Sequence, residues 1–313
     1  MVLEAPSHVV ETMSSHSSSA ANGPRDEDRV WAGKRNVRIK PNIGAEITGI
    51  SGHTFVAPNV AADARRLLDA HGVLIYRDAN IDDDDLKAFT RLLGPVHEFP
   101  DVAVVSLDPS LSRSASVQNG TFYWHIDGTM VEYPHQITLL TCLEPANDGS
   151  GDTEFANTYA AYDALSDAER AELEHLQVRY SYLNRQRLKQ GFMTPESIEN
   201  LKKMPPRDRS LVWTHRTGRR SMLLGSQAGE VIGWPLDEGE AFLGRLLAWS
   251  TQPRFTLRHH WERGDLVLWD NTGILHRAHP YALESGRLLH RTTVDNDHYV
   301  ATVGGGTGGD YAA

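Results

Sequence analysis

The most informative segment for the architecture is Gly264-Asp-Leu-Val-Leu-Trp-Asp-Asn271, which places four apolar residues between two pairs of turn-forming residues. A short apolar run with Gly, Asp and Asn at its ends is typical of a buried β-strand. Similar short runs are Ile137-Thr-Leu-Leu-Thr-Cys142 and Arg254-Phe-Thr-Leu-Arg-His259. The chain is therefore predicted to contain many short, buried strands.

Strands and helices are both predicted in the first hundred residues. The segments 37–40 and 44–50 have the alternation and turn residues of two short strands. Helices are predicted over 61–70 and over 82–93, the second with an acidic first turn, and a buried strand at 72–76 lies between them.

Two more helices are predicted farther along the chain. One follows the capping box Ser166-Asp-Ala-Glu169 and runs to about Leu176, and the other covers 238–250. Many short strands with a few helices favour a mainly β fold, a β-sandwich or jelly roll with flanking helices.

A single domain is expected over residues 30–301, because no fixed-period repeat divides the chain. Residues 1–29 are polar and rich in Ser and His in part, which predicts a disordered N-terminal arm. Residues 302–313 are rich in Gly, which predicts a flexible tail.

Composition excludes several classes of partner. The formal net charge of −10 argues against a nucleic acid or an anionic membrane, since phosphate binding requires a concentrated Lys/Arg face. Cys142 is the only cysteine, which excludes an intrachain disulfide and a cysteine-based zinc site. With no secretory or membrane-spanning pattern, we expect a cytoplasmic protein that acts on a small molecule. Homo-oligomerisation is left open.

A first pair of metal-ligand candidates stands in Trp124-His-Ile-Asp127. On a strand, His125 and Asp127 would point to the same face and could bind one metal ion. A chain with 15 His contains such a triplet by chance about as often as not. On this triplet alone, a polar strand edge is the preferred interpretation.

His276, which follows the predicted strand 264–271, is the best candidate for a third ligand. We expect it where that strand leaves the core. Two imidazoles and one carboxylate leave the opposite face of an octahedral iron open, where a bidentate 2-oxo acid and dioxygen can bind.

A 2-oxo diacid also needs a cation for its far carboxylate, because a carboxylate taken into a pocket must be paired. Arg287, eleven residues after His276, offers a permanently charged, bidentate fork. The hydroxyl of Thr153 could donate a second hydrogen bond. Taken alone, an Arg or a Thr near a strand end is more often a surface residue.

At this point the sequence resembles the taurine dioxygenase and 2,4-dichlorophenoxyacetate dioxygenase (TauD/TfdA) family of iron(II)/2-oxoglutarate enzymes. The resemblance covers most of the predicted domain, and its motifs agree in order and spacing. The matching segments are Trp124-His-Ile-Asp127, Gly151-Asp-Thr-Glu-Phe-Ala-Asn157, Ala160-Ala-Tyr-Asp-Ala-Leu165, Gly264-Asp-Leu-Val-Leu-Trp-Asp-Asn271, His276-Arg-Ala278 and Arg287-Leu-Leu-His-Arg-Thr-Thr293.

The resemblance implies a double-stranded β-helix core, a cupin-like jelly roll, and assigns residues to roles. The iron(II) ligands are His125, Asp127 and His276, and the 2-oxoglutarate contacts are Thr153 and Arg287.

Three assignments outside the metal site are weaker. Arg291 matches an arginine that meets the anionic group of the substrate, although an ion pair or water network would also explain it. Tyr123 either faces the substrate or lies in the core. Thr272 replaces an Arg of many relatives, which leaves the iron site intact but is expected to change its mouth.

The implied reaction couples oxidative decarboxylation of 2-oxoglutarate to succinate and CO2, with O2, to oxidation of a C–H bond in a small, anionic substrate. Hydroxylation is the default outcome, and desaturation, epoxidation or oxidative cleavage stay open. The carboxylate of Asp127 disfavours halogenation. Two alternatives are a zinc-type hydrolase, which would use the same donors, and a non-catalytic jelly-roll binding protein.

Most other histidines are interpreted as surface or core residues. The exception is His290, between Arg287 and Arg291, which is expected to support the site through a hydrogen bond. The set is His135, His175, His215, His259, His260, His279, His290 and His298.

Overall fold

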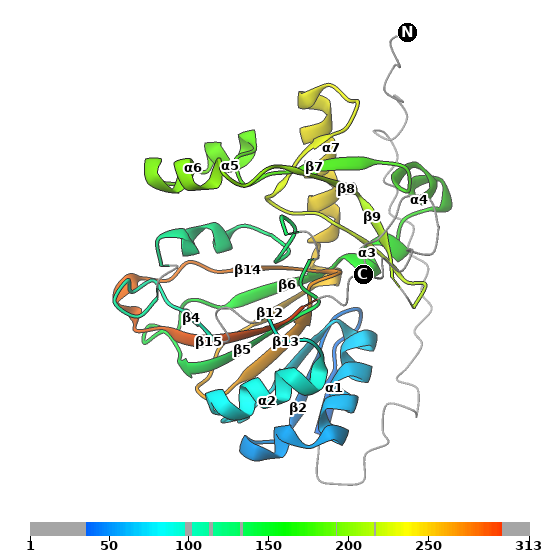
Figure 1. Ribbon diagram of the computed structural model, residues 1–313. Coiled ribbons are helices and arrows are strands. Elements are labelled where there is room, and N and C mark those ends of the chain that lie inside the picture. The colour runs from blue at the N-terminus through cyan, green and yellow to red at the C-terminus, as the bar shows by residue number, and fades with distance from the viewer. Residues whose placement is uncertain are drawn as a thin grey trace, which may run out of the picture.

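A computed structural model describes residues 36–97, 102–112, 115–131, 134–191, 193–215 and 217–295 (Figure 1). The predicted arm, 1–29, and the predicted tail, 302–313, lie outside these residues. Within the described part of the chain, no helix is long and apolar enough to cross a membrane.

The larger sheet has seven strands in the order β1-β2-β3-β13-β5-β15-β4. All neighbours are antiparallel except β2 and β3, which run parallel. Its strands are β1 (Asn36–Ile39), β2 (Ala45–Thr48), β3 (Val73–Tyr76), β4 (Ala103–Val105), β5 (Ile137–Glu144), β13 (Leu266–Asp270) and β15 (Leu288–Val294).

A smaller sheet of three antiparallel strands, in the order β12-β6-β14, carries the residues that face the larger one. Its strands are β6 (Thr153–Asn157), β12 (Thr256–His259) and β14 (Ile274–Ala278). Phe155 and Trp269, one from each sheet, pack with ring centroids 5.4 Å apart. The two sheets thus enclose a shared apolar layer, as in a jelly roll.

The strand predicted from residues 264–271 forms as β13 and is buried on both faces. Leu266 and Leu268 pack with the helices on one side, whereas Val267 and Trp269 pack in the layer between the sheets. Because successive side chains of a strand point to opposite faces, four consecutive apolar residues are needed here.

Two helices, α1 (Pro58–His71) and α2 (Asp83–Leu93), cover the outer face of the larger sheet (Figure 1). Both match the predicted helices. Asp82 caps α2 by accepting a 2.8 Å hydrogen bond from the amide of Asp85, which stabilises its acidic first turn.

The segment between β6 and β12 folds back over the smaller sheet with its own apolar cluster. The capping box at Ser166 is confirmed, although its helix ends at Leu173 rather than near Leu176. The elements here are α3 (Thr158–Asp163), α4 (Asp167–Leu173), β7 (Gln177–Tyr180), α5 (Arg185–Lys189), α6 (Pro195–Leu201), β8 (Arg207–Ser210), β9 (Val212–Thr214), β10 (Arg220–Met222), β11 (Ala228–Val231) and α7 (Leu236–Ser250).

Short 3-10 turns complete the described fold, and one of them shortens a predicted strand. The strand predicted from Arg254 begins only at Thr256, because the turn Pro253–Phe255 precedes it. The mainly β prediction with flanking helices is confirmed. The other 3-10 turns are η2 (Gly52–Val56), η3 (Ala115–Phe122) and η5 (Leu283–Ser285).

Candidate active site

Two backbone hydrogen bonds hold the predicted histidine ligands side by side. The amide of His125 donates to the carbonyl of His276 at 3.0 Å, and the amide of His276 donates to the carbonyl of His125 at 2.9 Å. This isolated antiparallel bridge brings the two imidazoles to a centroid distance of 4.2 Å. Residues 151 positions apart in the chain thus share one small region of the fold.

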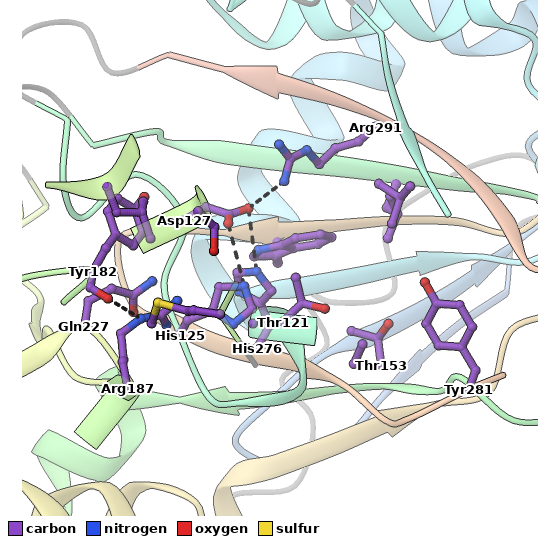
Figure 2. Close-up of a pocket in the computed structure, with 18 of the residues that line it drawn as sticks. Thr121, His125, Asp127, Thr153, Tyr182, Arg187, Gln227, His276, Tyr281 and Arg291 are labelled. Atoms are coloured by element: carbon purple, nitrogen blue, oxygen red, sulfur yellow. Dashed lines mark hydrogen bonds and ion pairs between the residues drawn. The ribbon is translucent and has the colours of Figure 1, made fainter. Parts of the chain in front are cut away.

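Asp127 completes the cluster from the turn that follows the bridge. Its carboxylate oxygens lie 3.7 Å from Nε2 of His125 and 3.6 Å from Nε2 of His276, as Figure 2 shows. One ligand atom from each of the three residues lies within 4.8 Å of the others. The structure therefore brings the predicted triad together.

The local structure that carries the triad differs from the prediction in two ways. His125 and Asp127 do not lie on a regular strand, because only His125 pairs with a neighbour. His276 stands in the middle of β14 rather than where a strand leaves the core.

A glycine lets the opposite backbone approach His125. A Cβ atom on Gly225 would lie 2.9 Å from Cα of His125, and its φ of +120° also disfavours a side chain. The next residue, Ser226, donates its amide to the carbonyl of Trp124 at 2.7 Å. The segment 124–125 is thus held on both sides.

The environment prepares the triad for a cation. Burial, then repulsion from His276, lowers the pKa of His125 to about 3, so its imidazole is neutral near pH 7. Burial alone would raise the pKa of Asp127, but Arg291, whose Nη1 lies 3.4 Å from Oδ2, and both histidines hold that pKa well below its usual range.

The hydrogen bond at Nδ1 determines which tautomer His125 adopts. Nδ1 lies 2.8 Å from the carbonyl oxygen of Tyr123 and can only donate to it, which leaves the lone pair of Nε2 directed toward Asp127. Imidazole nitrogens beside an ionised carboxylate are donors that suit a divalent iron ion. The residues present therefore fit the iron that the sequence predicts.

Arg287 and Thr153 line the same cavity as the triad. Arg287 is only 3% exposed, and its Nε atom has no hydrogen-bond partner among the described residues. Gly151 makes room for it, since a Cβ atom there would lie 2.7 Å from Cδ of Arg287. Burial lowers the pKa of Arg287, which indicates a desolvated cation that an anion would stabilise.

Thr153 is oriented by a neighbouring indole. Nε1 of Trp261 donates to Oγ1 of Thr153 at 3.0 Å, so the hydroxyl hydrogen of Thr153 can be directed at a bound acceptor. The guanidinium of Arg287 stacks 4.6 Å from the ring of Tyr281. This wall of the cavity therefore combines a buried cation with an oriented hydroxyl group, the kind of groups that can pair with an anion.

The cavity, of about 420 Å³, continues past the triad to a second polar wall. Figure 2 shows Tyr182, Arg187 and Gln227 on the other side of the triad from Thr153 and Tyr281. Arg187 is 6% exposed and donates to Oγ of Ser226 at 2.6 Å. Sequence reasoning missed this wall, because Arg187 comes from α5 while Tyr182 and Gln227 come from the connections before α5 and before β11, and none of these segments carries a recognisable motif.

Two predicted residues occupy other places. Tyr123 lies outside the set of described residues that line the cavity and contributes its carbonyl group instead. The prediction that His290 supports the site is wrong, since its Nδ1 lies 2.7 Å from Oδ1 of Asp83 in α2. Successive residues of β15 point to opposite faces, which separates His290 from Arg291.

Thr272 does not shape the mouth of the cavity as predicted. Its hydroxyl donates to Asp270 at 2.5 Å and lies 3.0 Å from the hydroxyl of Tyr159. This residue stabilises the turn that leads into β14 and is not among the cavity-lining residues.

Comparisons with known proteins agree with this geometry. The family model "Taurine catabolism dioxygenase TauD, TfdA family" matches residues 36–293. The alpha-ketoglutarate-dependent 2,4-dichlorophenoxyacetate dioxygenase of Cupriavidus pinatubonensis is 32% identical over 283 residues, which cover 84% of this chain and 98% of that protein. An alpha-ketoglutarate-dependent sulfate ester dioxygenase of Pseudomonas putida is 28% identical over 269 residues, or 82% and 87% of the two proteins.

A solved structure supports the same assignment. The crystal structure of AAD-2 in complex with Mn(II) and N-oxalylglycine matches with a TM-score of 0.73 and 27% identity, over 86% of this chain and 100% of that one. The jelly-roll prediction is thereby confirmed.

Fold and site together define a jelly-roll oxidoreductase that depends on 2-oxoglutarate and dioxygen. The chain belongs to the TauD/TfdA family of dioxygenases, as the sequence motifs predicted. This membership argues against both alternatives, the zinc-type hydrolase and the non-catalytic binding protein.

Proposed function

We propose that His125, Asp127 and His276 bind Fe(II), and that the enzyme oxidises a C–H bond of a small anionic substrate. The observation that carries this proposal is the convergence of the three side chains in one cavity with Arg287. Iron held there supplies the redox chemistry that couples decarboxylation of 2-oxoglutarate to succinate and CO2 with substrate oxidation.

Arg287 and Thr153 would bind the far carboxylate of 2-oxoglutarate. A buried guanidinium pairs with a carboxylate through two parallel hydrogen bonds, and the hydroxyl of Thr153 adds a third. The support is the burial of both groups and the absence of a hydrogen-bond partner for Nε of Arg287 among the described residues. Binding at this wall directs the opposite end of the co-substrate toward the triad.

Arg291 would contact the anionic group of the prime substrate. It lines the cavity next to Asp127 and is partly exposed, so an incoming anion can reach it. Relatives named for a phenoxyacetate and for a sulfate ester support an anionic substrate. Tyr182, Arg187 and Gln227 would form the wall against which the rest of that substrate packs.

Hydroxylation of the substrate is the proposed default outcome of the reaction.

We also propose that the enzyme is cytoplasmic. Cys142, the only cysteine, is buried. A chain that does not use disulfides is typical of a reducing compartment.

The test is oxygen-dependent formation of succinate from 2-oxoglutarate by protein loaded anaerobically with Fe(II). A panel of small carboxylates, sulfonates and sulfate esters would be compared in the wild type and in Asp127→Ala. Succinate formation that a panel member stimulates, and that the variant loses, is the expected result. Failure of the wild type to bind either Fe(II) or 2-oxoglutarate would overturn the proposal.

A further inference from the structure

A second cluster with the same donor types lies outside the active site. Nδ1 of His135 lies 2.8 Å from Oδ1 of Asp295, and Nδ1 of His97 lies 3.1 Å from its Oδ2. The two imidazole rings meet edge to face at a centroid distance of 4.9 Å. In the described part of the chain, this cluster and the triad are the groups in which three such ligands converge.

Backbone hydrogen bonds hold the three side chains in place. At the end of β15, the amide of Asp295 donates to the carbonyl of Pro95 at 2.7 Å, and the amide of His97 donates to Thr293 at 2.9 Å. On the other side, the amide of Gln136 donates to Val294 at 2.9 Å. Asp295 therefore extends from a central segment, with one histidine on each neighbouring segment.

The distances suit a shared metal ion. Bond lengths of about 2.0–2.2 Å from zinc to His nitrogen and carboxylate oxygen place tetrahedral ligand atoms roughly 3.3–3.6 Å apart. The separations of 2.8 Å and 3.1 Å at Asp295 are shorter than this range by less than about 1 Å. Small side-chain rotations would therefore convert the hydrogen-bonded cluster into a ligand set.

Among the described residues, the histidine–carboxylate pairs outside these two clusters lack a third ligand. His53 lies 2.8 Å from Asp85 and is 84% exposed, and no second imidazole joins this pair among the described residues. A hydrogen bond of this kind requires one histidine and one carboxylate. The meeting of two imidazoles on one carboxylate is the feature that distinguishes the cluster of His97, His135 and Asp295.

We propose that His97, His135 and Asp295 bind a divalent ion of the Zn²⁺ type at a site separate from the catalytic centre. Imidazole and carboxylate ligands bind Zn²⁺ more tightly than Fe²⁺ when geometry is equal. The side chains are 43%, 17% and 36% exposed, so an ion can enter from solvent. Three protein ligands leave the fourth position to water.

The position of the site gives the ion a structural effect. A Cβ atom on Gly128 would lie 2.7 Å from the amide nitrogen of His135, so His135 packs directly on the residue after Asp127. An ion at this site ties the segment after Asp127 to the end of β15. It therefore stabilises the backbone next to the catalytic triad without contacting the substrate.

The experiment is Zn²⁺ titration by calorimetry of the full chain carrying Asp127→Ala and His276→Ala, which removes two triad ligands. This background protein is expected to bind one equivalent of Zn²⁺. Adding His135→Ala or the isosteric Asp295→Asn should weaken binding by at least about 100-fold, because even a group that only hydrogen-bonds to a ligand contributes roughly 10- to 100-fold.

The matched control is His53→Ala in the same background, which should leave Zn²⁺ binding unchanged. Circular dichroism would verify that each variant is folded, and Asp295→Asn keeps the side-chain volume should His135→Ala unfold. Crystals grown with Zn²⁺ should show an anomalous peak beside Asp295. A background protein that binds no Zn²⁺, or binding that survives in Asp295→Asn, would overturn the proposal.

Discussion

Replacement of Arg287 by Met should abolish tight binding of 2-oxoglutarate while leaving the fold intact. The guanidinium is 3% exposed and stacks on Tyr281, so no water can take over its role in the pocket. Each charge-assisted hydrogen bond contributes about 1.5–3 kcal/mol. Losing two of them corresponds to roughly 10²- to 10⁴-fold weaker binding, at about 1.4 kcal/mol for each factor of ten.

The stability of the protein itself is expected to respond differently. Burial of Arg287 lowers its pKa, which shows that the cation is desolvated in the absence of an anion. A side chain of similar length without charge removes this desolvation cost. The free energy of unfolding of Arg287→Met, without ligands, should therefore not fall below that of the wild type.

Anaerobic calorimetry of metal-loaded protein would give the dissociation constant of 2-oxoglutarate, and urea unfolding would give stability. Arg287→Lys keeps the positive charge but loses the planar, bidentate guanidinium, so this variant should bind 2-oxoglutarate with intermediate affinity. Arg258→Met is the matched control, since Arg258 is 58% exposed and pairs with Asp152. A dissociation constant for Arg287→Met within threefold of the wild type would refute the reasoning.

Three smaller perturbations have defined outcomes. Thr153→Val keeps the shape but loses the hydroxyl that Trp261 orients; the KM for 2-oxoglutarate should rise about 10- to 150-fold, because one hydrogen bond to a charged carboxylate contributes about 1.5–3 kcal/mol. Gly273→Ala places a Cβ atom 2.0 Å from the ring of Tyr159, and urea unfolding should show a loss of about 1–3 kcal/mol. In metal-free protein, the pKa of His125 is about 3 in the folded state, against an ordinary 6.5. The contribution of His125 to the free energy of unfolding should therefore be complete above pH 6.5 and should decrease as the pH drops toward 3, because the unfolded chain takes up the proton first.

Each of these outcomes has a result that contradicts it. An unchanged KM in Thr153→Val would place the co-substrate carboxylate elsewhere, and wild-type stability of Gly273→Ala would mean that the ring of Tyr159 moves without cost. Urea unfolding of metal-free His125→Gln between pH 4 and pH 8 tests the predicted pH dependence. The free energy of unfolding of this variant should change less with pH than that of the wild type. An equal change with pH in both proteins would exclude His125 as the cause of the pH dependence.

Local sequence patterns were sufficient to predict those strands and helices that depend mainly on interactions among their own residues. The apolar run at Leu266–Trp269 forms β13, and the acidic segment after Asp82 forms the first turn of α2. Both depend on interactions within one strand or one helical turn, so their periodicity and capping residues are visible in a short window. The family motifs identified the triad residues in a similar way, because each motif is a short sequence segment and the motifs follow one another in a fixed order.

The tertiary structure decided how residues that are distant in the sequence are brought together. His125 faces His276 through a single bridge, and Arg187 reaches the cavity from α5, although no spacing in the sequence relates these residues. The same holds for His97 and His135, which converge on Asp295 because β15 runs between their segments. Strand pairing between remote segments sets these contacts, and the side chains involved carry no periodic signal of their own.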